Sequence, residues 1–340
     1  MDKLKIGMVG VGGFGGYRRE RLRETGLFHV LAAYDLNPKA LAAAQRDDGA
    51  QPMASYEELL AFPGLEAIVI STGAKFHAEQ ALAAAERGLH VFVEKPLCST
   101  PAEVQALLDV QRRKRVVIGV GHHDHHTCGT SRTIKKLMDT GDLGKIVSFE
   151  ATTCHSGGLA IKPGDWRGDC AKNPGGMLFQ CGVHKLHELM FYFGPVSSVF
   201  CQMRYDLHTT QTADAAWCQL RFASGLVGTL NAYHVTPYHH YLYIYGTRTN
   251  LYLDQNPSPA VPLRRQSLPP KLDNSREVVE PQPITEPDDR CGNVRSFYHA
   301  VRSGGTPSPS LADGARAVLV VFAAEESAKT GQVVAIPAVE

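Results

Sequence analysis

The stretch Leu4-Lys5-Ile6-Gly7-Met8-Val9-Gly10-Val11-Gly12-Gly13-Phe14-Gly15, near the amino terminus, decides the fold. Its first half is an apolar run that predicts a buried strand over 4–10, and a helical pattern over 15–25 follows its glycines. In such a loop the first glycine makes a tight turn, the second lets backbone N–H groups approach a diphosphate, and the third lets helix and strand pack closely. The phosphates then lie at the positive end of the helix. The stretch therefore predicts a dinucleotide-binding loop.

Asp35 indicates which dinucleotide this loop binds. It lies at the end of the second predicted strand, 29–34, where a carboxylate accepts hydrogen bonds from the adenosine ribose and repels a 2′-phosphate. We therefore expect NAD as the cofactor and consider NADP the less favoured alternative. Arg18 and Arg19 could instead bind a 2′-phosphate, but on the first helix we expect them to be solvated. The alternative to a cofactor site is a turn without ligand followed by a loop aspartate.

The fold class follows from the alternation of strand and helix patterns. Expected strands are 4–10, 29–34, 67–71, 90–94 and 116–121, with helices over 15–25, 38–47, 56–62, 77–87 and 101–114 between them. This order predicts an α/β protein whose first part is a Rossmann-type, doubly wound parallel sheet. After residue 122, β-branched and aromatic runs predict an α+β part with a large, open, mostly antiparallel sheet. The Pro-rich stretch 256–287 is expected to loop over the surface.

The expected division is therefore a Rossmann domain over 1–122 and an α+β domain over 123–340. Helices are predicted over 129–140 and 177–193, and a last helix over about 312–330 is expected to pack back. We expect the first domain to bind NAD and the second to bind the substrate.

Composition limits the partners and the location. The chain has 340 residues with 35 Lys+Arg against 34 Asp+Glu, so no basic field favours a nucleic acid. The apolar run 317–324 is far shorter than the roughly 20 residues that a membrane-spanning helix needs. A strand pattern begins almost at Met1, without a secretory signal pattern. Eight cysteines without a CxxC pair are typical of reduced thiols, so we expect a cytoplasmic protein.

Three further segments carry a resemblance to a known family. They are Val91-Phe92-Val93-Glu94-Lys95-Pro96-Leu97, the stretch from Gly175-Gly176 to His184, and Gly246-Thr247-Arg248-Thr249-Asn250-Leu251. Together with the glycine loop they resemble the Gfo/Idh/MocA oxidoreductases over nearly the whole chain. The resemblance implies NAD(P)-dependent oxidation of a CH–OH group in a sugar, glycoside or cyclitol. It also implies a homodimer or homotetramer formed through the second sheet.

The resemblance also implies roles for residues. Lys95 corresponds to the catalytic lysine, whose ammonium stabilises developing alkoxide charge, and His184 to the general base. Glu94 is expected to orient Lys95 or the nicotinamide ribose, and Pro96 to follow a cis peptide bond. His77 is either a cofactor contact or a helix-start residue. The expected cofactor contacts are Gly10, Gly12, Gly13, Phe14, Gly15, Asp35, Ser71, Thr72, His77, Glu94 and Lys95.

Gln180 departs from the family pattern, which usually has Asp there. It lies one helical turn before His184, where a carboxylate would stabilise the imidazolium and an amide only orients the ring. We include Gln180 among the catalytic residues. The departure leaves two alternatives open: a glycoside-cleaving enzyme that uses transient oxidation by NAD, and a non-catalytic sensor of NAD or sugar.

Histidines and one tryptophan supply the candidate substrate contacts. If 122–126 is extended, His123 and His125 share one face, and His155, His184 and His187 come from other segments. A divalent-metal site is then conceivable, but no ligand spacing is diagnostic, and we expect no metal. The expected substrate contacts are His123, His125, Asp165, Trp166, Arg167 and His187. Trp166 would stack on a sugar ring or, alternatively, lie in the core beside an ion pair. The aromatic stretch 233–240 is expected to serve sheet packing or a subunit interface.

Overall fold

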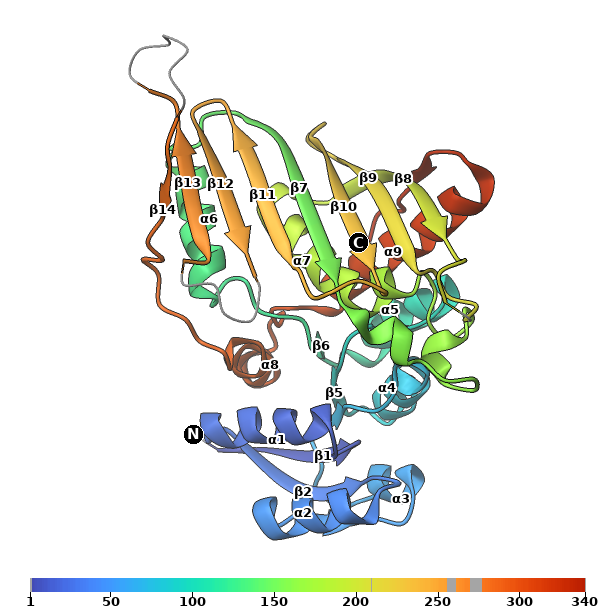
Figure 1. The fold of residues 1–340 in the computed structure, drawn as a ribbon. Helices are drawn as coiled ribbons and strands as arrows, with labels where there is room; N and C mark the ends of the chain where they lie inside the picture. Colours follow the sequence, from blue (N-terminus) through green and yellow to red (C-terminus); the bar gives the residue numbers. More distant parts are fainter. Residues whose placement is uncertain (1, 209, 256–260, 270–276, 340) are drawn as a thin grey trace. The chain divides into compact units, whose positions relative to one another are not determined.

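The computed structural model describes residues 2–208, 210–255, 261–269 and 277–339. The chain divides into two units, Met1–Asp124 with Asp289–Ala315, and His125–Asp288 with Arg316–Glu340. Figure 1 shows both units with most of their helices and strands labelled. The sequence alone placed 289–315 in the second domain, whereas the structure groups this segment with the first unit.

The first unit contains a parallel sheet with the strand order β3-β2-β1-β4-β5-β6. Its strands are β1 (Leu4–Val9), β2 (Phe28–Tyr34), β3 (Gln51–Pro52), β4 (Ala67–Ile70), β5 (His90–Val93) and β6 (Ile118–Val120). The helices are α1 (Phe14–Thr25), α2 (Pro38–Asp48), α3 (Tyr56–Leu60), α4 (His77–Glu86), α5 (Pro101–Lys114) and α8 (Gly292–Ser303). This strand order is that of the dinucleotide-binding Rossmann fold, so the predicted class is confirmed.

Helix α8 was not predicted, and it explains why 289–315 belongs to the first unit. Phe297 packs edge-on against Phe92 at 5.6 Å between ring centroids, and Tyr298 against Phe28 at 5.9 Å. Val294, Phe297 and Tyr298 are buried at the i, i+3, i+4 spacing of an amphipathic helix. The signal was therefore present, but only the tertiary structure shows which sheet this apolar stripe covers.

The second unit is built on a mixed sheet with the order β14-β13-β12-β11-β7-β10-β9-β8-β15. Its strands are β7 (Ile146–Cys154), β8 (Val196–Arg204), β9 (Ala215–Phe222), β10 (Val227–Tyr233), β11 (Tyr241–Gly246), β12 (Thr249–Asp254), β13 (Leu263–Ser267), β14 (Val279–Pro281) and β15 (Val334–Ala335). Among the described strands of this second sheet, only β7 and β10 pair in parallel. The predicted open, mostly antiparallel sheet is therefore confirmed.

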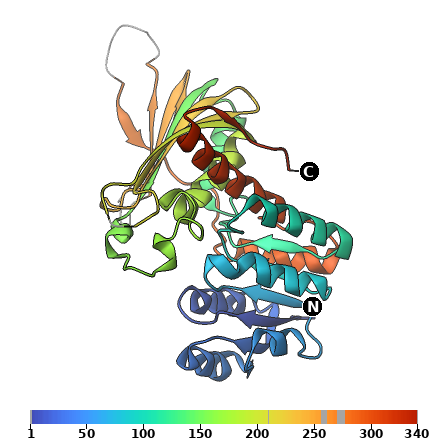
Figure 2. The same cartoon turned by 90° about the vertical axis from the view of Figure 1, so that its right-hand side faces the viewer.

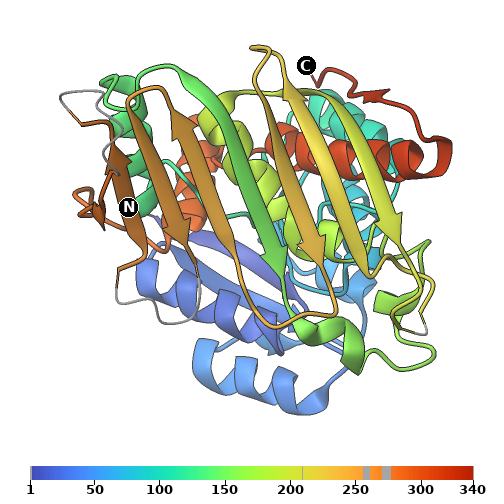
Figure 3. The ribbon, with the colours of Figure 1, turned by 45° about the horizontal axis from the view of Figure 1, so that its top comes forward.

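Helices cover one face of this sheet and leave the other open. Figures 2 and 3 show α6 (Gly129–Asp139), α7 (Val183–Phe193) and α9 (Leu311–Thr330) on the same face. Phe149 of β7 stacks on Phe193 of α7 at 5.1 Å and meets Phe222 of β9 edge-on at 5.5 Å. Strand β9 alternates in burial, which turns Trp217 toward the open face.

The stretch 256–287 is not only a surface loop. Within it, β13 and β14 form the edge of the sheet, while 256–260 and 270–276 lie outside the described residues. Charged and proline residues are common on edge strands, where they hide the alternation that predicts a strand.

Two further features concern the whole described chain. None of the helices within these residues is both long and apolar enough to cross a membrane. All eight cysteines are free thiols.

Candidate functional site

The glycine loop of the first unit leaves no room for larger side chains at two positions. A Cβ on Gly10, whose φ is +77°, would lie 2.7 Å from the backbone of Ser71, and one on Gly15 would lie 2.0 Å from the Gly10 carbonyl oxygen. Helix α1 therefore begins directly above the carboxyl ends of β1 and β4. Its N-cap is Gly13, with no side-chain cap and no acidic residue in the first turn. This helix start fits a diphosphate, because its N–H groups and dipole favour an anion.

Asp35 closes the other side of the loop. Its Oδ2 accepts hydrogen bonds from the backbone N–H groups of Val11 at 2.7 Å and Gly12 at 3.0 Å, and its Oδ1 accepts one from Asn37. The carboxylate thus lies at the end of β2 against the glycine loop, where a ribose would meet it. Phe14 starts α1 with an exposed ring 5.2 Å from that of Tyr17.

His77 holds the loop that carries Lys95. The Lys95–Pro96 peptide bond is cis, as predicted, and His77 Nδ1 lies 2.7 Å from the Pro96 carbonyl oxygen. Its Nε2 lies 3.0 Å from the carbonyl oxygen of Thr72, and the ring is buried. Burial lowers the pKa of His77, whereas the two carbonyl oxygens that face its ring nitrogens act in the opposite direction. His77 also begins α4, which agrees with the helix-start alternative.

Glu94 makes a buried ion pair with Arg18. Arg18 Nε lies 2.6 Å from Glu94 Oε1, and the two side chains are 3% and 5% exposed. The expectation that Arg18 and Arg19 are solvated is therefore wrong, since Arg19 is also buried and pairs with Asp48. Each arginine meets a carboxylate distant in sequence, and such a partner compensates for the cost of burying the charge.

Two buried oxygen atoms in this half of the site fit a ligand. Glu94 Oε2 and Ser71 Oγ are inaccessible and have no hydrogen-bond partner among the described residues. Thr72, the next residue, instead donates its hydroxyl to Gln80 at 2.6 Å. Buried polar atoms normally have partners, so a hydroxyl-rich group beside β4 and β5 would satisfy both. An NAD ribose would supply such hydroxyls.

In the second unit, a glycine pair positions the predicted catalytic helix. Gly175 and Gly176 have φ values of +69° and +56°, and a Cβ on Gly176 would lie 2.3 Å from the Ala213 carbonyl oxygen. Gly175 N–H donates to Glu325 Oε1 of α9 at 2.8 Å, and burial raises the pKa of Glu325. These contacts place the start of the helical segment against α9 and the turn before β9.

The helical segment itself differs from the predicted α-helix over 177–193. Leu178–Gly182 forms a π-helical turn, η4, and α7 follows from Val183. Gln180, His184 and His187 lie on one partly exposed stripe, while Val183 and Leu186 are buried. Single π turns occur frequently at functional sites. The shared face of Gln180 and His184 therefore agrees with the prediction.

The histidines after β6 do not form the predicted extended stretch. His123 is exposed and His125 is buried, and the chain turns at 125–127. His125 Nδ1 lies 2.8 Å from Ser131 Oγ, and its ring lies 5.1 Å from that of His187. The alternation that would have placed His123 and His125 on one face is therefore absent. No group of His, Cys, Asp or Glu suited to a metal occurs within the described residues.

The Trp166 loop is a short surface turn. Asp165 accepts a hydrogen bond from Arg167 N–H at 3.0 Å and pairs with the Arg167 guanidinium at 3.2 Å. That guanidinium lies 5.2 Å from the centre of the Trp166 ring, which is half-buried. The alternative to a sugar contact was a tryptophan buried in the core beside an ion pair. The structure contains the ion pair, but Trp166 is not in the core. The role of these residues in substrate binding remains a prediction.

A histidine cluster that was not predicted lies at the carboxyl ends of β7 and β10. His155 and His234 directly follow these parallel strands, and their rings lie 5.2 Å apart. His155 Nε2 lies 3.7 Å from Cys181 Sγ, next to Gln180, and His208 pairs with Asp214 on the other side. Polar groups gather at the carboxyl ends of parallel strands. The sheet was predicted to be mostly antiparallel, and no parallel pair of strands was expected here.

His234 should make the stability of the protein depend on pH. Burial, aided by nearby His155, His208 and Arg167, lowers its pKa from 6.5 to about 4. Between these values the unfolded chain binds the proton and the folded one does not, so stability is full above pH 6.5 and falls toward pH 4. The wild type should lose unfolding free energy between pH 7 and pH 4.5. We expect the His234→Gln variant to lose about 2 kcal/mol less over the same range.

Urea denaturation at both pH values measures this difference. The control is His299→Gln, at an exposed position of α8. This variant should lose as much unfolding free energy between the two pH values as the wild type does. An equal pH dependence in wild type and His234→Gln would show that His234 is not held neutral.

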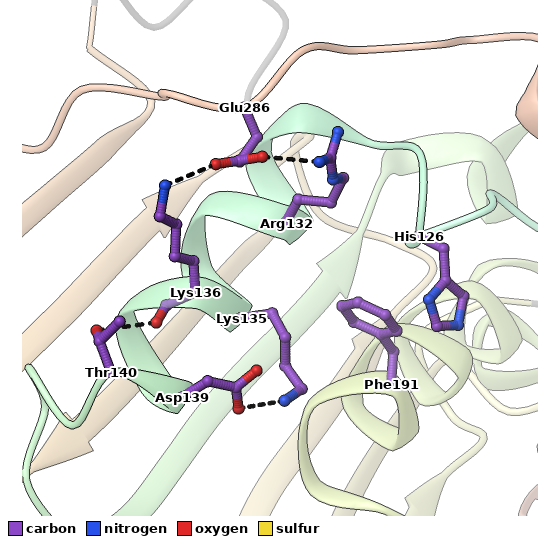
Figure 4. A pocket seen from close by; sticks show the side chains of 8 residues that line it. All are labelled: His126, Arg132, Lys135, Lys136, Asp139, Thr140, Phe191 and Glu286. Atoms are coloured by element: carbon purple, nitrogen blue, oxygen red, sulfur yellow. Dashed lines mark hydrogen bonds and ion pairs between the residues drawn. The ribbon is translucent and has the colours of Figure 1, made fainter.

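A separate cavity of about 560 Å³ opens between α6 and α7 (Figure 4). Its lining residues are His126, Arg132, Lys135, Lys136, Asp139, Thr140, Phe191 and Glu286. Arg132 and Lys136 both pair with Glu286, at 2.8 and 3.0 Å, and Lys135 pairs with Asp139. None of the predicted site residues lines this cavity.

The fold and the glycine loop define a dinucleotide-binding protein, and comparison with known proteins gives the family. Residues 4–122 match the oxidoreductase family with an NAD-binding Rossmann fold, and residues 131–252 match the GFO/IDH/MocA C-terminal domain. The chain belongs to the Gfo/Idh/MocA oxidoreductases, as the sequence motifs indicated.

Similar proteins cover almost the full length. The chain is 25% identical over 315 residues to 1,5-anhydro-D-fructose reductase of Ensifer adhaerens, covering 92% of each. It is 23% identical to myo-inositol 2-dehydrogenase of Thermotoga maritima, covering 95% of this chain and 96% of that one. Among solved structures, a putative NADPH-dependent oxidoreductase from Desulfitobacterium hafniense superposes with a TM-score of 0.89 at 25% identity, covering 99% and 98% of the chains. Levoglucosan dehydrogenase with NADH has a TM-score of 0.86 at 22% identity, covering 99% and 100%.

Proposed function

We propose that this protein is an NAD-dependent dehydrogenase that oxidises a CH–OH group of a sugar, glycoside or cyclitol. The observation that carries the proposal is the Lys95 loop. From Val91 to Cys98 every residue is buried except Lys95, which alone reaches the surface at the end of β5. The relatives named above, an anhydrofructose reductase and an inositol dehydrogenase, support the substrate class.

In this proposal Lys95 and His184 handle the proton. Bound NAD would supply the hydride acceptor. The Lys95 ammonium donates a hydrogen bond to the reacting hydroxyl and stabilises the alkoxide as it forms. His184 accepts the proton, since an imidazole is the side chain best suited to proton transfer near neutral pH. Gln180, on the same stripe of the helix, orients the His184 ring without adding charge.

The proposal is tested by following nicotinamide reduction with purified protein across sugars, anhydrosugars, cyclitols and aryl glycosides. Steady NADH formation with one class would support it and name the substrate. Loss of substrate without NADH would replace it with cleavage through transient oxidation. Binding of NAD without any turnover across the whole panel would favour a sensor. A parallel series with a chelator reports whether a metal takes part.

Asp35 should set the choice of cofactor. We expect Asp35→Ala to lower the preference for NAD over NADP, as the ratio of kcat/KM values, by at least about tenfold. The carboxylate that repels a 2′-phosphate is then gone, while the loss of its bonds to Val11 and Gly12 weakens both cofactors alike. Asp109→Ala, on the surface of α5, is the control. An unchanged ratio would contradict the role of Asp35.

Gln180→Asp should change the pH dependence. A carboxylate one turn from His184 favours the imidazolium and raises its pKa, so the acidic limb of the kcat profile should move up by about one pH unit. The profile of kcat against pH measures this shift. If oxidation also rises more than about tenfold, Gln180 is a weakened form of the family site. An unmoved limb would show that the two side chains do not interact.

We further propose a homodimer or homotetramer formed through the open face of the second sheet. Trp217 and Tyr233 meet there at 5.9 Å, and Tyr241 stacks on Tyr243 at 4.5 Å. Exposed aromatic surface of this kind is enriched at protein interfaces. Light scattering of wild type and Trp217→Glu tests this assembly.

The eight free thiols support a cytoplasmic location.

A further inference from the structure

We propose that Arg18 is a positioning residue for the reaction: its buried ion pair with Glu94 holds the backbone that carries Lys95. This inference rests on the proposed function, which gives Lys95 its catalytic role. Arg18 belongs to α1, the helix that starts at the cofactor loop, whereas Glu94 immediately precedes Lys95. The ion pair therefore joins the cofactor-binding helix to the reacting lysine.

The guanidinium of Arg18 is fixed from several sides. Besides the 2.6 Å contact to Glu94, its Nη1 donates to Asn293 Oδ1 at 3.3 Å, and its Cζ lies 4.8 Å from the centre of the Phe92 ring. Asn293 in turn donates its amide to the carbonyl oxygen of His122 at 2.8 Å. Contacts from the end of β5 and from α8 thus hold the Arg18 side chain, and the segment after β6 holds Asn293 in turn. A group so restrained provides a rigid support for its partner.

Glu94 has little freedom to adopt another position. A Cβ on Gly121 would lie 2.3 Å from Glu94 Oε2, so only a glycine leaves room for this carboxylate. The Glu94 N–H also donates to the Ile70 carbonyl oxygen at 2.9 Å. Beyond Lys95, the Pro96 carbonyl oxygen is held by His77. Lys95 therefore lies between two buried anchors, and Arg18 completes the first of them.

Removal of Arg18 would disturb this arrangement specifically. It would leave the Glu94 carboxylate buried without its counter-ion, which is costly, so Glu94 would take up a proton or move. Either change alters the charge or the geometry next to Lys95. A displacement of about 1 Å at a reacting group can lower a rate by roughly 10²-fold.

Arg19 provides a matched control. It is the next residue of α1, is equally buried and also makes ion pairs, but its partners are Asp47 and Asp48 at the end of α2. Arg18→Met and Arg19→Met each remove one buried arginine from one helix. A purely structural role predicts similar losses of melting temperature and no difference in catalysis between them.

The experiment measures melting temperature, NAD affinity and the pH profile of kcat for wild type, Arg18→Met, Arg18→Lys and Arg19→Met. We expect kcat to fall about 10- to 100-fold in Arg18→Met alone, with the pH profile shifted and the loss of NAD affinity smaller than the loss of kcat. Arg18→Lys, which keeps the charge, should recover most of the loss. Equal catalytic losses in the two methionine variants would overturn the proposal. Glu94→Gln, which keeps the shape, replaces Arg18→Met if that variant does not fold.

A second readout separates this inference from the proposed function. Competitive acylation of lysine amines at a series of pH values, analysed by mass spectrometry, reports the reactivity of Lys95 without turnover. We expect the Lys95 profile to shift by at least about 0.5 pH unit in Arg18→Met but not in Arg19→Met. A shift without dehydrogenase activity would sustain the Arg18 inference and reject the proposed function. An unshifted profile would reject the inference even in an active enzyme.

Discussion

Lys95→Met is expected to lower kcat for oxidation of the CH–OH group about 10³-fold, far more than it weakens NAD binding. General acid–base catalysis contributes roughly 10²- to 10⁴-fold, and stabilisation of a developing oxyanion adds to it. Methionine keeps the unbranched chain of lysine as far as its fourth atom and lacks only the ammonium. The two buried neighbours of Lys95 are unchanged, so Glu94 keeps its contact to Arg18 and Pro96 keeps its contact to His77. The loss should therefore come from the missing ammonium.

Stopped-flow and steady-state rates of NADH formation, with a fluorescence titration of NAD, measure both quantities. Lys114→Met is the control. Lys114 ends α5 at the surface, where it pairs with Glu86 of α4, so this variant should be as active as the wild type. If Lys95→Met lost less than about tenfold in kcat, Lys95 would not be the catalytic lysine that the motif indicates.

Gly15→Ala is expected to weaken NAD binding by at least about 100-fold. A Cβ there would lie 2.0 Å from the Gly10 carbonyl oxygen and 2.8 Å from its carbonyl carbon, both of which are backbone atoms. Helix α1 would have to move away from β1, and its first N–H groups would leave the position at which they meet the diphosphate. We also expect a lower melting temperature, because the same contact joins helix and strand.

Gly16→Ala is the matched control for this prediction. It is the next residue of α1, and its nearest neighbour to a Cβ would be the Val11 carbonyl oxygen at 3.8 Å, an ordinary contact. Alanine in a helix is favoured over glycine by about 1 kcal/mol, so this variant should be slightly more stable and bind NAD normally. Calorimetric titration with NAD compares the two variants. Equal affinities would show that the glycine loop is not the cofactor site.

Local patterns in the sequence predicted much of the fold and of the first half-site. The apolar runs of β1 and β4, the glycine loop and the Glu94-Lys95-Pro96 motif each span only a few residues. Helix starts such as Thr100-Pro101 are equally local, and Thr100 indeed caps α5 in a capping box with Glu103. Such features depend on neighbours along the chain, so the sequence alone specifies them.

Other features depend on residues that meet only in space. Nothing near Arg18 in the sequence indicates that Glu94, 76 positions later, lies 2.6 Å away, so its burial could not be predicted. The π-helical turn before His184 could not be predicted from the periodicity of apolar residues either. An α-helix and a π-helix differ by less than one residue per turn.

The sequence by itself determined the Rossmann class, the cofactor loop and the motif lysine, because strand pattern, glycine geometry and helix start are short-range properties. Only the tertiary structure decided that α8 completes the first unit and that β7 and β10 run in parallel, bringing His155 and His234 together. It also decided that Arg18 neutralises Glu94. These outcomes depend on which apolar stripes and which charged side chains are buried together although they are distant in sequence. Such contacts form only when the chain folds, so short-range patterns do not specify them.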